Sequence, residues 1–151
     1  MTNVTIERSK LIDASPDRAW QVIADMNGYQ DHVTGLSTTE VVSGDGVGAV
    51  RHCVDTSGAD WYETCDVWEP GSHYSVDVDV STYPLKYRAL FSAFRGTWSV
   101  TPSGDGTVIG MRFDATLRNV PGVAKLVKRL VEQSTADLDA TLESYEAAAL
   151  N

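Results

Sequence analysis

The chain has 151 residues, which fits one domain with a core of its own. Asp and Glu number 21 against 12 Lys and Arg, so the formal net charge is -9. This charge disfavours nucleic acid and anionic lipid as non-specific partners, although it also simply keeps a small protein soluble. No segment has the length of a membrane span or the pattern of a secretion signal. We therefore expect one cytoplasmic domain over residues 1–151, with at most transient membrane contact.

The chain opens with a predicted strand at residues 4–13 and a predicted helix from Pro16 to about Met26. Ser15 suits the N-cap and Pro16 the first helical position, and the acidic Asp17 favours the positive end of the helix. Asn-Gly at 27–28 ends the helix, and residues 29–33 are compatible with one more helical turn.

From Leu36 onward the hydrophobic period becomes two, which is typical of strands. We predict strands at 37–43, 49–56, 60–68, 72–80, 88–101 and 107–117. Short turns rich in Gly, Asp, Ser and Pro separate most of them, which indicates antiparallel hairpins. The glycine-rich segment 44–48 leads into a strand instead of a helix, so we interpret it as a hairpin turn and not as a nucleotide loop. The connection 81–87 is longer and contains Pro84.

A long helix is predicted from Gly122 to about Ala148, because apolar residues recur there at helical spacing. It would span about 40 Å, enough to cross a whole sheet. The element order therefore predicts an α+β fold, with a curved antiparallel sheet of about seven strands around a long C-terminal helix.

The late strands alternate between an apolar and a polar face, so one face of the sheet should be buried. The predicted inward rows are Leu90, Phe94, Trp98 and Val100; Ile109, Met111, Phe113, Ala115 and Leu117; and Tyr74, Val76, Val78 and Val80. A strongly twisted sheet curled around one helix can enclose a hollow, but the same aromatic residues also suit a solid core.

The middle hairpin, 49–68, carries polar and apolar residues on both faces. We favour its odd-numbered residues as inward, which would place Arg51 near Glu63 inside the hollow. The alternative is a solvated cross-strand ion pair. The same hairpin would bring Cys53 opposite or diagonal to Cys65 as free, half-buried thiols.

Other charged and metal-binding residue types give weaker indications. The three histidines show no ligand spacing, so no metal site is expected, and His32 is either a ligand contact or an exposed helical residue. Basic residues crowd the start of the final helix at Arg118, Lys125, Lys128 and Arg129, where they oppose the helix dipole. They could steer an acidic ligand or dock a partner or membrane, or they could form an ordinary solvated face.

The pattern resembles the START/Bet v 1-like superfamily, also called SRPBCC, and in particular its polyketide cyclase/dehydrase and lipid-transport group. The resemblance covers nearly the whole chain and rests on the order and spacing of several segments. These are Ile12 to Asp25, Gly46 to Arg51, Glu63 to Pro70, and Gly96 to Pro102 with the hairpin that follows. It implies the helix-grip fold, a hydrophobic pocket between sheet and C-terminal helix, and neither metal nor cofactor. Members include aromatase/cyclases and lipid or quinone carriers.

The expected function is therefore binding or carriage of a small hydrophobic molecule such as a lipid, polyketide, sterol or quinone, in a protein whose oligomeric state stays open. The candidate ligand contacts are Trp61, Tyr74, Phe94, Trp98, Met111, Phe113, Leu126, Leu130, Ser134 and Leu138. One alternative is a cofactor-free polyketide cyclase or dehydratase, with Glu63 as an acid–base group whose pKa burial raises and Arg51 to orient the substrate. Another is a regulatory or interaction module with a vestigial pocket.

Overall fold

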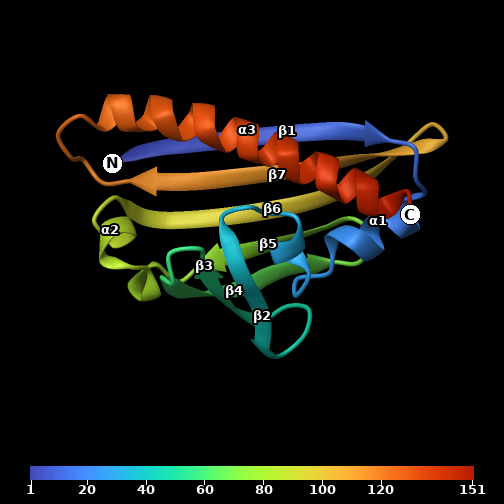
Figure 1. Cartoon of the computed structure of the whole chain (residues 1–151), viewed down its shortest axis with the longest axis horizontal. Coiled ribbons are helices and arrows are strands. Elements are labelled where there is room, and N and C mark those ends of the chain that lie inside the picture. Colours follow the sequence, from blue (N-terminus) through green and yellow to red (C-terminus); the bar gives the residue numbers. More distant parts are fainter.

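A computed structural model describes all of residues 1–151 and contains one seven-stranded antiparallel sheet with a long C-terminal helix across it (Figure 1). The strand order is β1-β7-β6-β5-β4-β3-β2. The elements in chain order are β1 (Thr2–Ile12), α1 (Pro16–Ile23), the 3-10 turn η1 (Tyr29–Asp31), β2 (Leu36–Ser43), β3 (Val50–Asp55), β4 (Asp60–Glu69), β5 (His73–Val78), the 3-10 turn η2 (Val80–Thr82), α2 (Leu85–Arg88), β6 (Phe91–Ser103), β7 (Gly106–Leu117) and α3 (Val123–Ala149). This is the helix-grip arrangement, so the predicted fold is confirmed.

The sheet is built almost entirely from neighbours in sequence. Each strand from β2 to β6 pairs with the next along the chain, and β1 pairs with β7 over its whole length. Residues 79–90, with η2 and α2, connect β5 to β6, and short turns make the other connections. The hairpins expected from the turn residues therefore all form, including the glycine-rich turn between β2 and β3. The helix α3 crosses β1 and β7 and meets α1 near the C-terminus (Figure 1).

Helix α1 begins where its capping residues predict. Ser15 Oγ accepts a hydrogen bond from the backbone N–H of Arg18 at 3.2 Å, and Pro16 occupies the first helical position. The helix ends at Ile23, three residues earlier than predicted. The chain turns there because the Asp25 carboxylate accepts a hydrogen bond from the backbone N–H of Gly28, which favours a turn over a further helical bond.

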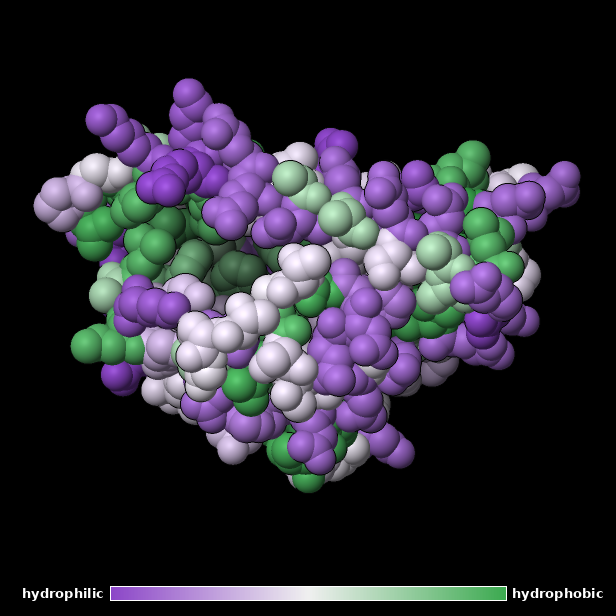
Figure 2. All heavy atoms as spheres, viewed as in Figure 1, coloured by the Kyte–Doolittle hydropathy of each residue, from purple (hydrophilic) through white to green (hydrophobic).

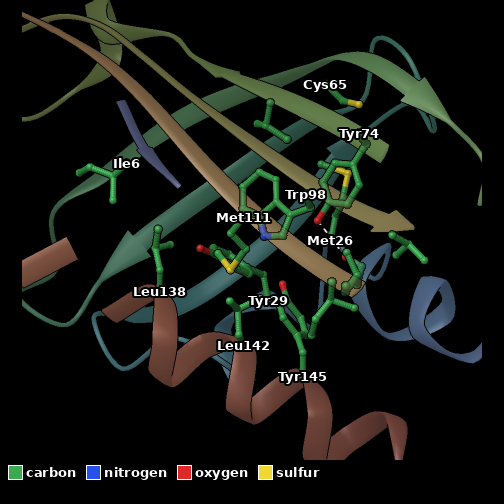
Figure 3. Close-up of a cluster of buried hydrophobic side chains, with 14 of the residues drawn as sticks. Ile6, Met26, Tyr29, Cys65, Tyr74, Trp98, Met111, Leu138, Leu142 and Tyr145 are labelled. Atoms are coloured by element: carbon green, nitrogen blue, oxygen red, sulfur yellow. Dashed lines mark hydrogen bonds between the residues drawn. The ribbon is translucent and has the colours of Figure 1, made fainter. Parts of the chain in front are cut away.

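The core lies between the concave face of the sheet and the C-terminal half of α3. The predicted inward rows of β5, β6 and β7 are mostly buried there, among them Tyr74, Trp98 and Met111. Leu138, Leu142 and Tyr145 of α3 reach toward them (Figure 3). The N-terminal half of α3 has no fully buried residue and contributes only partly buried side chains to the core, so the helix covers one end of the sheet more tightly than the other.

Two strand predictions are wrong at their ends. The strand expected over 72–80 stops at Val78, because the Asp79 carboxylate accepts a hydrogen bond from the Ser81 backbone N–H at 3.1 Å and starts a 3-10 turn containing Val80. The strand expected from residue 88 starts at Phe91, after the short helix α2. Val80 and Leu90 therefore lie outside the strands whose inward rows they were expected to continue.

Candidate functional site

A cavity of about 160 Å³ lies on the concave side of the sheet, at the end that the C-terminal half of α3 leaves uncovered. Nine of its twelve lining residues are hydrophobic, so its wall is mostly apolar. The lining residues are Tyr29, Leu36, Arg51, Trp61, Glu63, Val76, Val78, Tyr83, Phe94, Gly96, Trp98 and Phe113. Figure 2 shows an apolar hollow on this side, below the beginning of α3.

The alternation of the strands accounts for most of this wall. Strands β3 to β7 each contribute inward-facing residues, while η1 adds Tyr29 and the segment before α2 adds Tyr83. Gly96 of β6 helps to keep the space open, because a Cβ atom at this position would lie 2.7 Å from the ring of Trp98. The missing side chain of Gly96 thus makes room for the Trp98 ring, and the Gly96 backbone borders the cavity beside it.

A buried ion pair forms the polar part of the wall. Arg51 and Glu63 occupy directly opposite positions of β3 and β4. The Nε and Nη2 atoms of Arg51 donate hydrogen bonds to Oε2 of Glu63 at 3.0 and 2.6 Å, and Trp61 Nε1 donates to Oε1 of Glu63 at 3.0 Å. Nη1 of Arg51 donates to the backbone carbonyl of Met26 at 3.3 Å. The odd-numbered face of this hairpin therefore points inward, as favoured from the sequence.

The guanidinium of Arg51 is only 1% exposed, yet its charge is well compensated. Burial by itself would lower the pKa of Arg51, but the neighbouring Glu63 carboxylate outweighs this effect, so the pKa is raised. The guanidinium carbon also lies 5.0 Å from the ring centre of Tyr29 and 5.8 Å from that of Trp98. The cation is thus held in place by both its counter-ion and two aromatic faces.

Four of the ten candidate ligand contacts line this cavity: Trp61, Phe94, Trp98 and Phe113. Tyr74, Met111 and Leu138 also face inward, but they belong to the packed core. Helix α1 accounts for the position of Tyr74, because the hydroxyl of this residue donates to the backbone carbonyl of Ile23 at 2.8 Å. Inward-facing residues at one end of the sheet therefore line the cavity, and those at the other end belong to the packed core.

The remaining three candidates, Leu126, Leu130 and Ser134, lie on the N-terminal half of α3 and do not line the cavity. Leu126 is 36% exposed. Leu130 packs against the core while only partly buried. The apolar spacing of this helix is continuous, so the sequence gives no sign that only its second half contains fully buried residues. The role of these residues as ligand contacts stays a prediction.

Half of the residues that line the cavity were not predicted as site residues from the sequence. The alternation of their strand predicted that Val76 and Val78 face inward, but they were not among the predicted ligand contacts. Gly96 carried a usable signal, because a glycine inside a strand often marks a close approach. Tyr29, Leu36 and Tyr83 come from turns and a strand end, where no periodicity indicates a direction.

The cysteines do not lie where the hairpin was expected to place them. Cys53 pairs with Trp61 across β3 and β4, and the Arg51–Glu63 pair separates it from Cys65. The prediction that the thiols lie opposite or diagonal is therefore wrong, because the actual turn shifts the register. Both cysteines are free and fully buried instead of half-buried.

His32 packs against α3 instead of entering the cavity. Its Nδ1 lies 2.8 Å from Ser144 Oγ, and its ring centre lies 4.4 Å from that of Tyr145. Burial lowers the pKa of His32. The structure contains no group of three or more His, Cys, Asp or Glu side chains placed to share a metal ion, and none of its helices is both long and apolar enough to span a membrane.

Comparison with known proteins gives a family match but no curated relative. A family model described as "Polyketide cyclase / dehydrase and lipid transport" matches residues 3–143. No curated protein matches the sequence.

Several solved structures share the fold at low sequence identity. One is the protein TTHA0849 from Thermus thermophilus, with a TM-score of 0.73 and 20% identity over 97% of both chains. Another is the Zhui aromatase/cyclase from Streptomyces sp. R1128, with a TM-score of 0.72 and 20% identity over 96% of this chain and 94% of the other. A third is norcoclaurine synthase from Thalictrum flavum, with a TM-score of 0.76 and 19% identity over 99% of this chain and 87% of the other.

Proposed function

Because the chain belongs to the polyketide cyclase/dehydrase and lipid transport family, we propose that it binds a small, mostly apolar molecule in the cavity beside Arg51 and Glu63. The observation that carries this proposal is an aromatic cavity whose wall contains one self-compensated ion pair. Apolar burial would supply the affinity, at about 25 cal/mol per Å² removed from water. The ion pair would orient a polar group of the ligand.

The size of the cavity limits the ligand. Its volume of about 160 Å³ is close to the roughly 150 Å³ of an engineered protein cavity that binds benzene. It is well below the range of about 300–1,000 Å³ typical of sites for drug-sized ligands. We therefore propose a ligand with one ring, or a larger lipid, polyketide, sterol or quinone of which one ring-sized part enters the cavity.

The ion pair favours a neutral oxygen on that ligand. Arg51 has five N–H donors, and its hydrogen bonds to Glu63 and Met26 use three of them. The cation is already neutralised by Glu63, so a carboxylate on the ligand would leave an excess negative charge in a buried site. A hydroxyl or carbonyl group would add a hydrogen bond without this cost.

The structural relatives offer a parallel for a ligand of this size. Norcoclaurine synthase from Thalictrum flavum has been crystallised in complex with dopamine and hydroxybenzaldehyde, each of which has a single ring. At 19% identity the two proteins share a fold and no more can be concluded, so this parallel supports the choice of probe and does not identify the ligand.

Titration with p-cresol, a single ring with one hydroxyl, tests the proposal. Chemical-shift changes in a two-dimensional NMR spectrum should saturate and should concentrate on cavity residues such as Phe94 and Phe113. Gly96→Ala should weaken binding, because the added Cβ would lie 2.7 Å from the Trp98 ring and 3.2 Å from the Phe113 ring and so displace rings that line the cavity. Gly110→Ala is the matched control, because its Cβ would meet Ser99 Oγ at 2.6 Å and Gly110 does not line the cavity. Absence of saturable binding, or equal binding by both variants, would contradict the proposal and favour an interaction module.

A second candidate is a cofactor-free cyclase or dehydratase. The observation that favours it is the carboxylate of Glu63, which lines the cavity and could exchange a proton with a bound substrate. A substrate that is turned over by the wild-type protein, and bound but not turned over by Glu63→Gln, would support catalysis. Binding without any turnover in the wild-type protein would support carriage.

A further inference from the structure

The basic residues of the chain differ in whether they have a carboxylate partner. Five of the 12 Lys and Arg residues form ion pairs: Arg8, Lys10, Arg51, Arg95 and Arg112. Arg18 donates hydrogen bonds to the backbone carbonyls of Ala148 and Asn151. The other six have no carboxylate within ion-pair distance, and we call them the basic end: Lys86, Arg88, Arg118, Lys125, Lys128 and Arg129.

These six residues gather at one end of the molecule. Lys86 and Arg88 lie on α2, and Arg118 follows β7. Arg118 Nε donates to the backbone carbonyl of Arg88 at 3.0 Å, so the segment that leads into α3 is held against α2. Figure 1 shows α2 and the beginning of α3 at the same end of the sheet. Half of all Lys and Arg residues of an acidic protein are therefore concentrated there.

Two exposed leucines lie among these cations. Leu85 begins α2 directly before Lys86 and is 74% exposed, and Leu126 follows Lys125 on α3 and is 36% exposed. Single exposed apolar residues are common on protein surfaces. Here, however, each leucine is next to a lysine in sequence, and the two lie on α2 and on the beginning of α3, at the same end of the molecule (Figure 1).

Stability does not account for this arrangement. Helix α3 starts at Gly122 without a side-chain cap, and its first turn contains no acidic residue. Lys125 lies in that first turn, and Lys128 and Arg129 follow in the next, so their charges face the positive end of the helix dipole. The unpaired cations also repel one another. The placement makes folding slightly less favourable, which points to a role in binding.

We propose that the basic end docks on an anionic lipid surface, with Leu85 inserting between the head groups. The cations would attract the anionic phosphates of the lipid head groups. An exposed apolar side chain among them is unfavourable in water and becomes favourable when it is buried in a bilayer interface. The formal net charge of -9 does not prevent this contact. The Debye length is about 8 Å at physiological ionic strength, so acidic residues farther from the membrane than this are largely screened.

The docked orientation would bring the hollow close to the membrane. Tyr83 of the cavity wall lies two residues before the first residue of α2, and Phe94 lies in the first part of β6, which follows α2. A ligand that leaves the lipid phase would therefore meet the aromatic wall without first crossing the acidic surface. The docking surface and the cavity are separate features, and each can fail without the other.

Vesicle flotation tests the docking directly. The wild-type protein should bind vesicles of phosphatidylcholine mixed with phosphatidylglycerol at low salt, should bind phosphatidylcholine alone weakly, and should be released as salt rises. The variant Lys125→Gln/Lys128→Gln/Arg129→Gln should bind on the order of a hundredfold more weakly. The control Arg8→Gln/Lys10→Gln/Arg112→Gln removes the same number of charges outside the basic end and should bind like the wild type.

Leu85→Ser distinguishes insertion from simple charge attraction. Because Leu85 is exposed, the substitution should leave folding unchanged and weaken vesicle binding by on the order of tenfold. No binding to anionic vesicles, equal losses in the two triple variants, or no effect of Leu85→Ser would each overturn the proposal. In the last case the basic end would serve a purely ionic partner. Titration of every variant with p-cresol reports the cavity independently, so failure of docking and failure of ligand binding are distinguishable.

Discussion

Arg51 and Glu63 face each other across β3 and β4, and the Nη2 atom of Arg51 lies 2.6 Å from Oε2 of Glu63 in the wall of the cavity. Arg51 is among the most deeply buried residues of the protein. Neither charge could remain at this depth alone, because a buried ion without its partner costs several kcal/mol. The folded protein therefore needs both members of this ion pair whether or not a ligand binds.

Glu63→Gln should destabilise the protein by about 3–5 kcal/mol, because it leaves the Arg51 cation buried without a counter-ion. Urea unfolding measures the loss. Arg51→Met combined with Glu63→Leu should recover most of the stability, since it removes both charges and keeps the volume apolar. Glu7→Gln is the surface control: Glu7 lies 4.0 Å from Arg112 in an exposed pair, and its loss should cost less than about 1 kcal/mol. Equal effects of Glu63→Gln and Glu7→Gln would contradict a stabilising role for the buried pair.

The sequence alone was sufficient for the fold. The order and type of all the main elements follow from the change of hydrophobic period at Leu36 and the long helical stretch after Gly122. Parity put Arg51 and Glu63 with the other odd-numbered residues of their strands, because residues two apart on a strand share a face. That this face points inward was only the favoured alternative, since both faces carry polar and apolar residues, and the burial of the two side chains confirms it. Element ends were less predictable, since side-chain hydrogen bonds such as that of Asp79 to Ser81 decide them.

The cavity was predictable only in part. Alternation identifies which side chains point inward, but not which of them meet another element. Tyr74 and Trp98 share the inward face and stack at 5.1 Å, yet Trp98 borders the cavity while α1 covers Tyr74. That difference depends on where α1 and the C-terminal half of α3 contact the sheet. The periodicity of a single chain contains no information about these distances.

Neither cysteine should react with a thiol reagent while the protein is folded. Cys53 and Cys65 are fully buried, and burial raises the pKa of each thiol, so little reactive thiolate exists. Incubation with Ellman's reagent should give no rapid release of chromophore in buffer and two equivalents in denaturant. Rapid labelling of one thiol in buffer would show that this part of the sheet opens locally without global unfolding.

Stability should fall as the pH decreases below about 6.5, through the protonation of His32. Burial lowers the pKa of this imidazole from its usual 6.5, so the unfolded chain binds a proton at a higher pH than the folded protein. The contribution of neutral His32 to the free energy of unfolding is complete above pH 6.5, and it is lost as the pH falls from 6.5 through the lower pKa of the folded protein. His32→Gln should show a smaller decrease in the free energy of unfolding between about pH 8 and about pH 5.5. Identical decreases in the two proteins would assign the pH dependence to other groups.

Two buried tyrosines should respond differently to loss of the hydroxyl group. Tyr145 OH and Trp98 Nε1 are buried without a hydrogen-bond partner, although Figure 3 shows the two side chains close together. Tyr74 OH, by contrast, donates to the Ile23 carbonyl at 2.8 Å. Because an unpartnered buried hydroxyl is unfavourable, Tyr145→Phe should leave the free energy of unfolding unchanged or raise it by about 1 kcal/mol.

Tyr74→Phe is the matched comparison, since it removes the same atom from an equally buried ring. It should lower the free energy of unfolding by about 1 kcal/mol or more, because the Ile23 carbonyl loses its donor. Denaturant unfolding of both variants and the wild type gives the two differences. A destabilising Tyr145→Phe would reveal that its hydroxyl does have a partner in solution. The first such partner to consider is the Trp98 indole N–H, because it has no acceptor of its own and can donate to a phenol oxygen.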